Sequence, residues 1–151
     1  MLLDSHLVPE TVVKPRSFVG LMALYESNYL RLLRLLPEID RLDGCFRSRV
    51  AGDCDLHIEI LERSRYTVTL SLTYHMHTDD GLLTDPDMTV RVYLDCNLAE
   101  AMSVGKQQRS ATLRRIVREH RRELDARWRR NVILNKWLEY LSDQGHLVLD
   151  R

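Results

Sequence analysis

The run of residues 66–77 constrains the fold of this chain more than any other feature, because apolar and polar residues alternate along its whole length. A period of two places successive side chains on opposite faces of a strand. The same alternation recurs over residues 56–61 and 88–95. The sequence therefore predicts an antiparallel sheet with one apolar face and one polar face.

Shorter segments extend the predicted sheet at both ends. The turn signal Asp43-Gly44 leads into a strand over residues 45–50, and residues 98–104 form a fifth strand if the alanines there follow the same period. The acidic stretch 78–86, which contains glycine and proline, is interpreted as a loop. Together these segments predict a meander of four to five strands.

Helical periodicity flanks the sheet on both sides. Ser17 is a capping residue, and apolar side chains then recur at spacings of three and four until Pro37 ends the pattern. A last helix is predicted to begin near Asn131 and to end at Gly145, and residues 146–149 are compatible with a short strand. The expected fold is α+β with two layers, in which the N- and C-terminal helices pack on the apolar face of the sheet.

Composition indicates one ordinary globular domain. Apolar residues make up 44% and charged residues 29% of the 151 residues, which is unlike a disordered or membrane-spanning chain. Residues 1–15 are predicted to be an irregular arm and residues 16–151 a single domain. The N-terminal residues do not resemble a signal peptide, and three cysteines at unrelated spacings suit a reduced compartment as structural thiols. The predicted location is the cytoplasm, without membrane contact.

Residues 106–130 form a strongly basic segment. It contains ten Lys or Arg and three acidic residues, a net +7, so the rest of the neutral chain carries −7. Residues 112–127 are compatible with a solvated helix, which is the first of three interpretations. The second is a protein contact, for example with the acidic loop of the same or another subunit. The third is nucleic-acid binding through Trp128 and the arginines, although zero net charge argues against it; these are Arg114, Arg115, Arg118, Arg121 and Arg122.

The polar face of the predicted sheet is the second candidate surface. Its chemically versatile residues are Glu59, His75, His77, Arg91, Tyr93 and Asp95. Imidazole and carboxylate groups can hold a metal ion, and Arg91 can bind an anion or pair with Glu59 or Glu62 across the sheet. The simplest interpretation is a solvated sheet face, so the sequence predicts no metal ion and no cofactor.

The sequence lacks the common catalytic motifs that would indicate an enzyme. The sequence contains no glycine-rich phosphate loop, no Gly-x-Ser-x-Gly elbow and no His-Glu-x-x-His pair. We therefore expect a protein that binds rather than one that catalyses.

Several stretches of the chain resemble the YqiB-like family of uncharacterised bacterial proteins. The resemblance lies in MALYESNY at residues 22–29, ERSRYT at 62–67 and MTVRVYLD at 88–95, and continues near Asn131 and Trp137. It implies a cytoplasmic bacterial protein and brings no catalytic residue or cofactor with it. The basic segment 106–130 departs from the family pattern, and so do His75 and His77.

Taken together, these features predict a small cytoplasmic binding or adaptor protein with a protein partner or a second copy of itself. A nucleic-acid-binding accessory factor, acting through residues 106–130, is the first alternative. An enzyme that uses a metal ion or a small ligand on the polar sheet face is the second.

Overall fold

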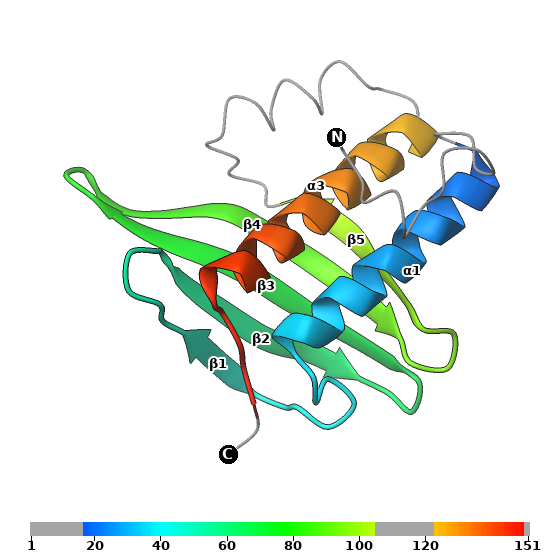
Figure 1. Cartoon of the computed structure of the whole chain (residues 1–151), viewed down its shortest axis with the longest axis horizontal. Helices are drawn as coiled ribbons and strands as arrows, with labels where there is room; N and C mark the ends of the chain where they lie inside the picture. Colours follow the sequence, from blue (N-terminus) through cyan, green and yellow to red (C-terminus); the bar gives the residue numbers. More distant parts are fainter. Residues whose placement is uncertain (1–16, 105–122, 150–151) are drawn as a thin grey trace.

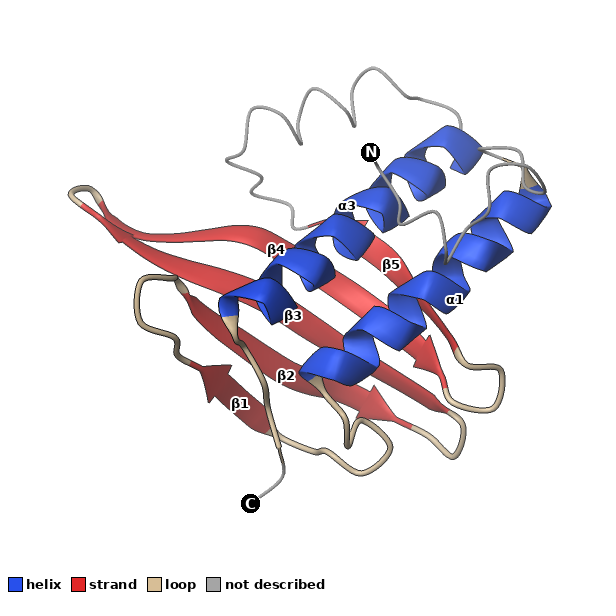
Figure 2. Ribbon diagram, viewed as in Figure 1, coloured by secondary structure: helices blue, strands red, loops and turns tan. Residues whose placement is uncertain are grey.

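A computed structural model describes residues 17–104 and 123–149 of the chain. The described residues form two layers, a five-stranded sheet and two helices that lie side by side on one of its faces (Figures 1 and 2). The elements are α1 (Phe18–Leu35), β1 (Cys45–Ser48), β2 (Asp55–Arg63), β3 (Thr67–Thr78), β4 (Gly81–Tyr93), β5 (Leu98–Val104) and α3 (Glu123–Gln144). The predicted α+β class with terminal helices is confirmed.

The sheet is an open antiparallel meander, because its strands are ordered in space as they are in sequence. The predicted alternation decides which side chains enter the core. Leu70, Leu72 and Val90 are fully buried under the helices, whereas their neighbours along the strands face the opposite side. Burying one apolar face of the sheet is the main stabilising contribution to this architecture.

The two helices begin and end where local chemistry favours it. The Ser17 hydroxyl accepts a hydrogen bond of 3.0 Å from the backbone N–H of Gly20, which caps α1 as predicted. Gly145 follows α3 with φ of +97°, a left-handed conformation that costs glycine little. Neither described helix is long and apolar enough to cross a membrane.

The acidic loop predicted over residues 78–86 is wrong in extent. β3 continues to Thr78 and β4 already begins at Gly81, so only Asp79 and Asp80 remain as the turn of a long hairpin. Pro86 lies where the β3–β4 register shifts by a residue. A bulge tolerates proline because the extra residue donates no ladder hydrogen bond. The sequence pattern had instead predicted a loop that ends at Pro86.

The predicted start of the last helix is also wrong. α3 begins at Glu123 rather than near Asn131, so part of the basic segment belongs to the same helix as the apolar stripe. The reason is Trp128, which is 6% exposed and packs in one cluster with Leu21, Leu24 and Tyr25 of α1. The predicted helix over 112–127 lies mostly in residues 105–122, outside the described residues.

The residues after α3 do not pair as the predicted short strand. Two backbone hydrogen bonds connect them to the helices: the N–H of His146 donates to the carbonyl of Leu141 in α3 over 3.0 Å, and the N–H of Val148 donates to the carbonyl of Leu35 at the end of α1 over 2.9 Å. We refer to residues 146–149 as the C-terminal tail.

Two buried asparagines close the β5 edge of the sheet. The Asn131 side-chain oxygen accepts hydrogen bonds from the backbone N–H of Ala101 (2.7 Å) and from the Asn28 amide (3.1 Å). The Asn28 amide also donates to the carbonyl of Ala99 over 3.4 Å. The carbonyl of Ala99 and the N–H of Ala101 are therefore occupied and are not free to pair with another strand.

Replacing Asn131 with alanine is expected to lower the free energy of unfolding by about 2 kcal/mol, because the buried Ala101 N–H loses its acceptor. Urea unfolding followed by circular dichroism measures the loss. The control is Lys136→Ala, an exposed position on the same helix, which should change stability little. An equally small effect of Asn131→Ala would contradict this role of the asparagine.

Candidate functional site

The sheet face opposite the helices is the candidate functional surface, and we call it the open face. Both described helices lie on the other side of the sheet (Figures 1 and 2). The strand register places polar side chains from all five strands together on the open face. They are Arg47, Asp55, His57, Glu59, Glu62, Thr67, Thr69, Ser71, Thr73, His75, Asp87, Thr89, Arg91, Tyr93 and Glu100.

Negative charge predominates on the open face. Its carboxylates are those of Asp55, Glu59, Glu62, Asp87 and Glu100, whereas its guanidinium groups are those of Arg47 and Arg91. With neutral histidines, five carboxylates and two guanidinium groups give a net charge of −3, which becomes −2 when Arg49, paired with Asp55 over 3.0 Å, is included. Such a surface favours a ligand that carries positive charge over a polyanion.

His57 of β2 and His75 of β3 stack on this surface, close to the β1–β2 loop. Their ring centroids are 3.6 Å apart and the ring planes differ by 18°. A pocket of about 460 Å³ opens beside His75, between the β1–β2 loop and the end of β3. A smaller pocket of about 170 Å³ opens beside His57. The stacked pair thus lies between the two pockets.

Burial, together with electrostatic repulsion from His75 and Arg47, lowers the pKa of His57 below its ordinary value of 6.5. The unfolded chain therefore binds this proton first as the pH falls, and the protein is expected to lose stability as the pH falls through about 6.5. Urea unfolding at neutral and at mildly acidic pH measures the loss. His57→Gln should reduce the loss, and an unchanged pH dependence in that variant would contradict the assignment.

Arg91 and Tyr93 lie on the open face as predicted, and both are held by neighbours. The Arg91 Nε donates to the Thr69 hydroxyl over 3.3 Å, rather than forming the expected ion pair with Glu59 or Glu62. The Tyr93 hydroxyl donates to the Glu100 carboxylate over 2.6 Å. Burial and this carboxylate raise the pKa of Tyr93. Hydrogen bonds therefore fix the orientation of both side chains, and both remain partly accessible to solvent.

The other predicted residues of the polar face are distributed differently. Glu59 and His75 belong to the open face, and His77 is exposed near the tip of the β3–β4 hairpin, where it lines the larger pocket. Asp95 does not join them, because β4 ends at Tyr93 and Asp95 lies in the turn that follows. Over residues 17–104 and 123–149, no three His, Cys, Asp or Glu side chains are grouped so that they could hold a metal ion.

The candidate residues of the basic segment are only partly described. Arg114, Arg115, Arg118, Arg121 and Arg122 lie outside the described residues. Trp128 is described, and its side chain is buried between α3 and α1, so the indole is not exposed for the predicted stacking on a base. Cys45 and Cys96 are exposed rather than packed as structural thiols.

A buried cluster of Ser48, Asp53, Tyr74 and His146 was not found by reading the sequence. The Ser48 hydroxyl lies 2.8 Å from His146 Nδ1, and His146 Nε2 lies 2.8 Å from a carboxylate oxygen of Asp53. The Tyr74 hydroxyl donates to the same oxygen over 2.7 Å. Because His146 is 98 residues from Ser48 and 93 from Asp53, no local sequence motif indicates this cluster.

The cluster contains the side chains of a serine hydrolase triad, but it is built differently. In such a triad the serine faces Nε2 and the acid faces Nδ1, whereas here the two nitrogens are exchanged. Ser48 is 6% exposed, and the adjacent pocket is lined by Asp53 but not by Ser48 or His146. We therefore interpret the cluster as a structural connection between β1, the β1–β2 loop and the C-terminal tail.

The ionisation of the cluster agrees with this structural role. Burial raises the pKa of Asp53, but the hydrogen bonds from Tyr74 and His146 outweigh burial and leave it below its ordinary value. Burial and the adjacent Asp53 raise the pKa of Tyr74. At neutral pH the carboxylate is therefore charged and the phenol is neutral, which suits the observed hydrogen bond.

Comparison with known proteins places the chain in a family. Residues 31–147 match the model of a family described as "Protein of unknown function (DUF1249)". The uncharacterized protein YqiB of Escherichia coli strain K12 is 30% identical over 134 residues, which are 87% of this chain and 93% of YqiB. YqiB of strain O157:H7 matches equally well, and no solved structure matches the chain. The chain therefore belongs to the DUF1249 family, as the resemblance in its sequence indicated.

Proposed function

We propose that this protein is a small cytoplasmic binding protein, an adaptor without catalytic activity of its own, and that it binds a protein partner through the open face. The observation that carries the proposal is the open face itself. It is a broad polar surface on which hydrogen-bonding side chains are fixed by cross-strand contacts, such as those of Arg91 and Tyr93. A surface whose side chains are already ordered loses little entropy when a partner binds.

The cytoplasmic location is supported by the cysteines. Cys45 and Cys96 are exposed and unpaired, and exposed free thiols persist in a reducing compartment.

Charge favours a protein partner over nucleic acid at this surface. The five carboxylates of the open face would repel a phosphate backbone, and only two guanidinium groups are available there to neutralise it. Basic and hydroxyl-bearing side chains of a protein surface can pair with the same carboxylates. A partner with a basic patch therefore fits best.

The proposal is tested by affinity capture from a bacterial lysate treated with nuclease, comparing two matched double variants. The open-face variant carries Glu59→Lys and Arg91→Gln. The control variant carries Glu26→Lys and Lys136→Gln, which make the same charge changes at exposed positions on the helix side. We expect the control to retain a protein that the open-face variant loses.

Two results would contradict the proposal. Equal capture by both variants would show that the open face is not the binding surface. Capture that nuclease abolishes would identify nucleic acid as the ligand and would favour the basic segment as its site. Circular dichroism of both variants checks that each is folded.

A further inference from the structure

The outer edge of β1 carries backbone groups that the sheet does not use. Within the described residues β1 is an edge strand, paired with β2 alone. The N–H of Ile60 in β2 donates to the carbonyl of Gly44 over 2.9 Å, so Gly44 directs its backbone groups towards β2. Because this direction alternates along an antiparallel strand, the N–H and C=O groups of Cys45 and Arg47 point away from the sheet.

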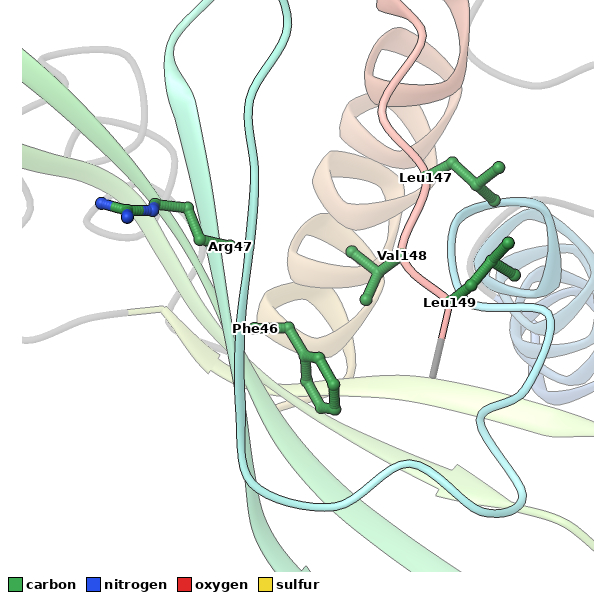
Figure 3. A pocket seen from close by; sticks show the side chains of 5 residues that line it. All are labelled: Phe46, Arg47, Leu147, Val148 and Leu149. Carbon is green, nitrogen blue, oxygen red and sulfur yellow. The ribbon is translucent and has the colours of Figure 1, made fainter. Parts of the chain in front are cut away.

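A groove of about 400 Å³ runs along this edge. It is lined by Phe46 and Arg47 of β1 and by Leu147, Val148 and Leu149 of the C-terminal tail (Figure 3). Figure 3 shows the Val148 side chain pointing across the groove towards β1 and the Arg47 side chain pointing away from the tail. Phe46 and Val148 belong to or pack against the main core, so the bottom of the groove is apolar.

The two edge strands of the sheet differ in whether side chains bond to their outward-facing backbone groups. At β5, Asn28 donates to the carbonyl of Ala99 and Asn131 accepts from the N–H of Ala101. At β1, no described side chain does the same for Cys45 and Arg47, and an apolar groove lies beside them. An edge strand with unused backbone groups next to an apolar groove has the features of a site for strand addition.

We propose that this groove binds one extended peptide segment of a partner protein, which pairs with the outer edge of β1 as an additional strand. The alternation of a strand decides the chemistry of that segment. Its apolar side chains would face Phe46 and Val148, and its intervening side chains would lie on the side of Arg47. This site goes beyond the proposed function, because it uses the backbone edge of β1 and the groove beside it, and Arg47 is its only side chain on the open face.

The charge at the rim of the groove selects an acidic segment. Arg47 is exposed and, among the described residues, has no recorded hydrogen bond or ion pair. The nearby Arg49 differs, because its guanidinium pairs with Asp55 over 3.0 Å. A carboxylate at the position opposite Arg47 would complete a cross-strand ion pair. The segment that fits therefore alternates apolar and acidic residues.

The test measures fluorescence anisotropy of a labelled, end-blocked peptide Glu-Val-Glu-Val-Glu-Val with the full chain. Wild-type protein should bind it, and should bind Lys-Val-Lys-Val-Lys-Val more weakly. Arg47→Gln should lower the affinity for the acidic peptide by up to about fivefold, which is the contribution expected of an exposed ion pair. Arg65→Gln, which removes an exposed arginine at the β2–β3 turn, should leave binding unchanged.

A second variant separates strand pairing from charge. Arg47→Pro removes the same charge as Arg47→Gln and also removes the outward N–H, while the N–H groups that bond to β2 remain. Binding should fall clearly below that of Arg47→Gln, with thermal unfolding showing that both variants fold. In addition, the peptide should slow thiol labelling of Cys45 on the edge and leave labelling of Cys96 in the β4–β5 turn unchanged.

Three results would overturn the inference. They are the absence of binding to wild type, equal affinity for the acidic and basic peptides, and equal affinity of Arg47→Pro and Arg47→Gln. Light scattering adds a fourth: a wild-type dimer that Arg47→Pro converts to a monomer would assign the groove to a second copy of this chain. Because none of these variants alters Glu59 or Arg91, failure here leaves the proposed function of the open face untouched.

Discussion

Replacing Trp128 with alanine is expected to lower the free energy of unfolding by about 4 kcal/mol, as for other buried large aromatic residues. The indole fills the space between α3 and α1, where it contacts the cluster of Leu21, Leu24, Tyr25 and Val132. Alanine would leave a cavity that these side chains can close only in part. Urea unfolding followed by circular dichroism measures the difference.

Two comparisons show whether the loss comes from packing. Trp128→Phe keeps most of the buried area and should cost about 1 to 2 kcal/mol. Phe18→Ala removes an aromatic ring that is 71% exposed on α1 and should change stability by less than about 0.5 kcal/mol. If Trp128→Ala unfolds like wild type, the tryptophan is a surface residue and stacking on a base becomes tenable again.

Replacing His146 with alanine is expected to cost about 3 kcal/mol at neutral pH. The substitution removes the hydrogen-bonding partner of Ser48 and one of the partners of the charged Asp53, and all of these groups are buried. Tyr74→Phe removes a single hydrogen bond to the same carboxylate and should cost about 1.5 kcal/mol. The effects of the two substitutions on the free energy of unfolding should not be additive in the double variant, because both side chains contact the same carboxylate oxygen of Asp53.

Acid unfolding provides a second view of this cluster. The pKa of Asp53 is lower in the folded protein than its ordinary value of 3.8, so Asp53 contributes stability that is present above that pH and is lost as the pH falls through the folded pKa. His146→Ala should weaken this dependence on pH. The control is Leu147→Ala at an exposed neighbouring position, and an equally small effect of both substitutions would contradict the structural role of His146.

The architecture follows from local patterns wherever those patterns are periodic. The alternation in residues 66–77 predicts β3 and its buried face, and the spacing of apolar residues after Ser17 predicts α1. The loop predicted up to Pro86 was too long because a bulge accommodates this proline inside β4. The start of α3 was predicted too late in the sequence, because the buried Trp128 lies among arginines that are typical of a solvated segment. In both places a tertiary contact decides against the local signal.

The candidate site was predictable only in part, for a related reason. Period two brings Glu59, His75, Arg91 and Tyr93 to one face, and the register confirms it. The stacking of His57 on His75 depends on how two strands align, which no single strand reveals. The groove beside β1 requires the C-terminal tail to lie next to a strand about a hundred residues earlier. Long-range placement of this kind leaves no trace in local spacing.

The measurement that tests the open face most directly is carboxylate footprinting of the protein with its captured partner. Carbodiimide-driven coupling of an amine reports how accessible each carboxylate is. We expect the partner to protect Glu59 and Asp87, on the open face, and to leave Glu26 and Asp143, on the helices, as reactive as before. Protection of Glu26 and Asp143 with unchanged Glu59 and Asp87 would contradict it, because the partner would then bind the helical layer.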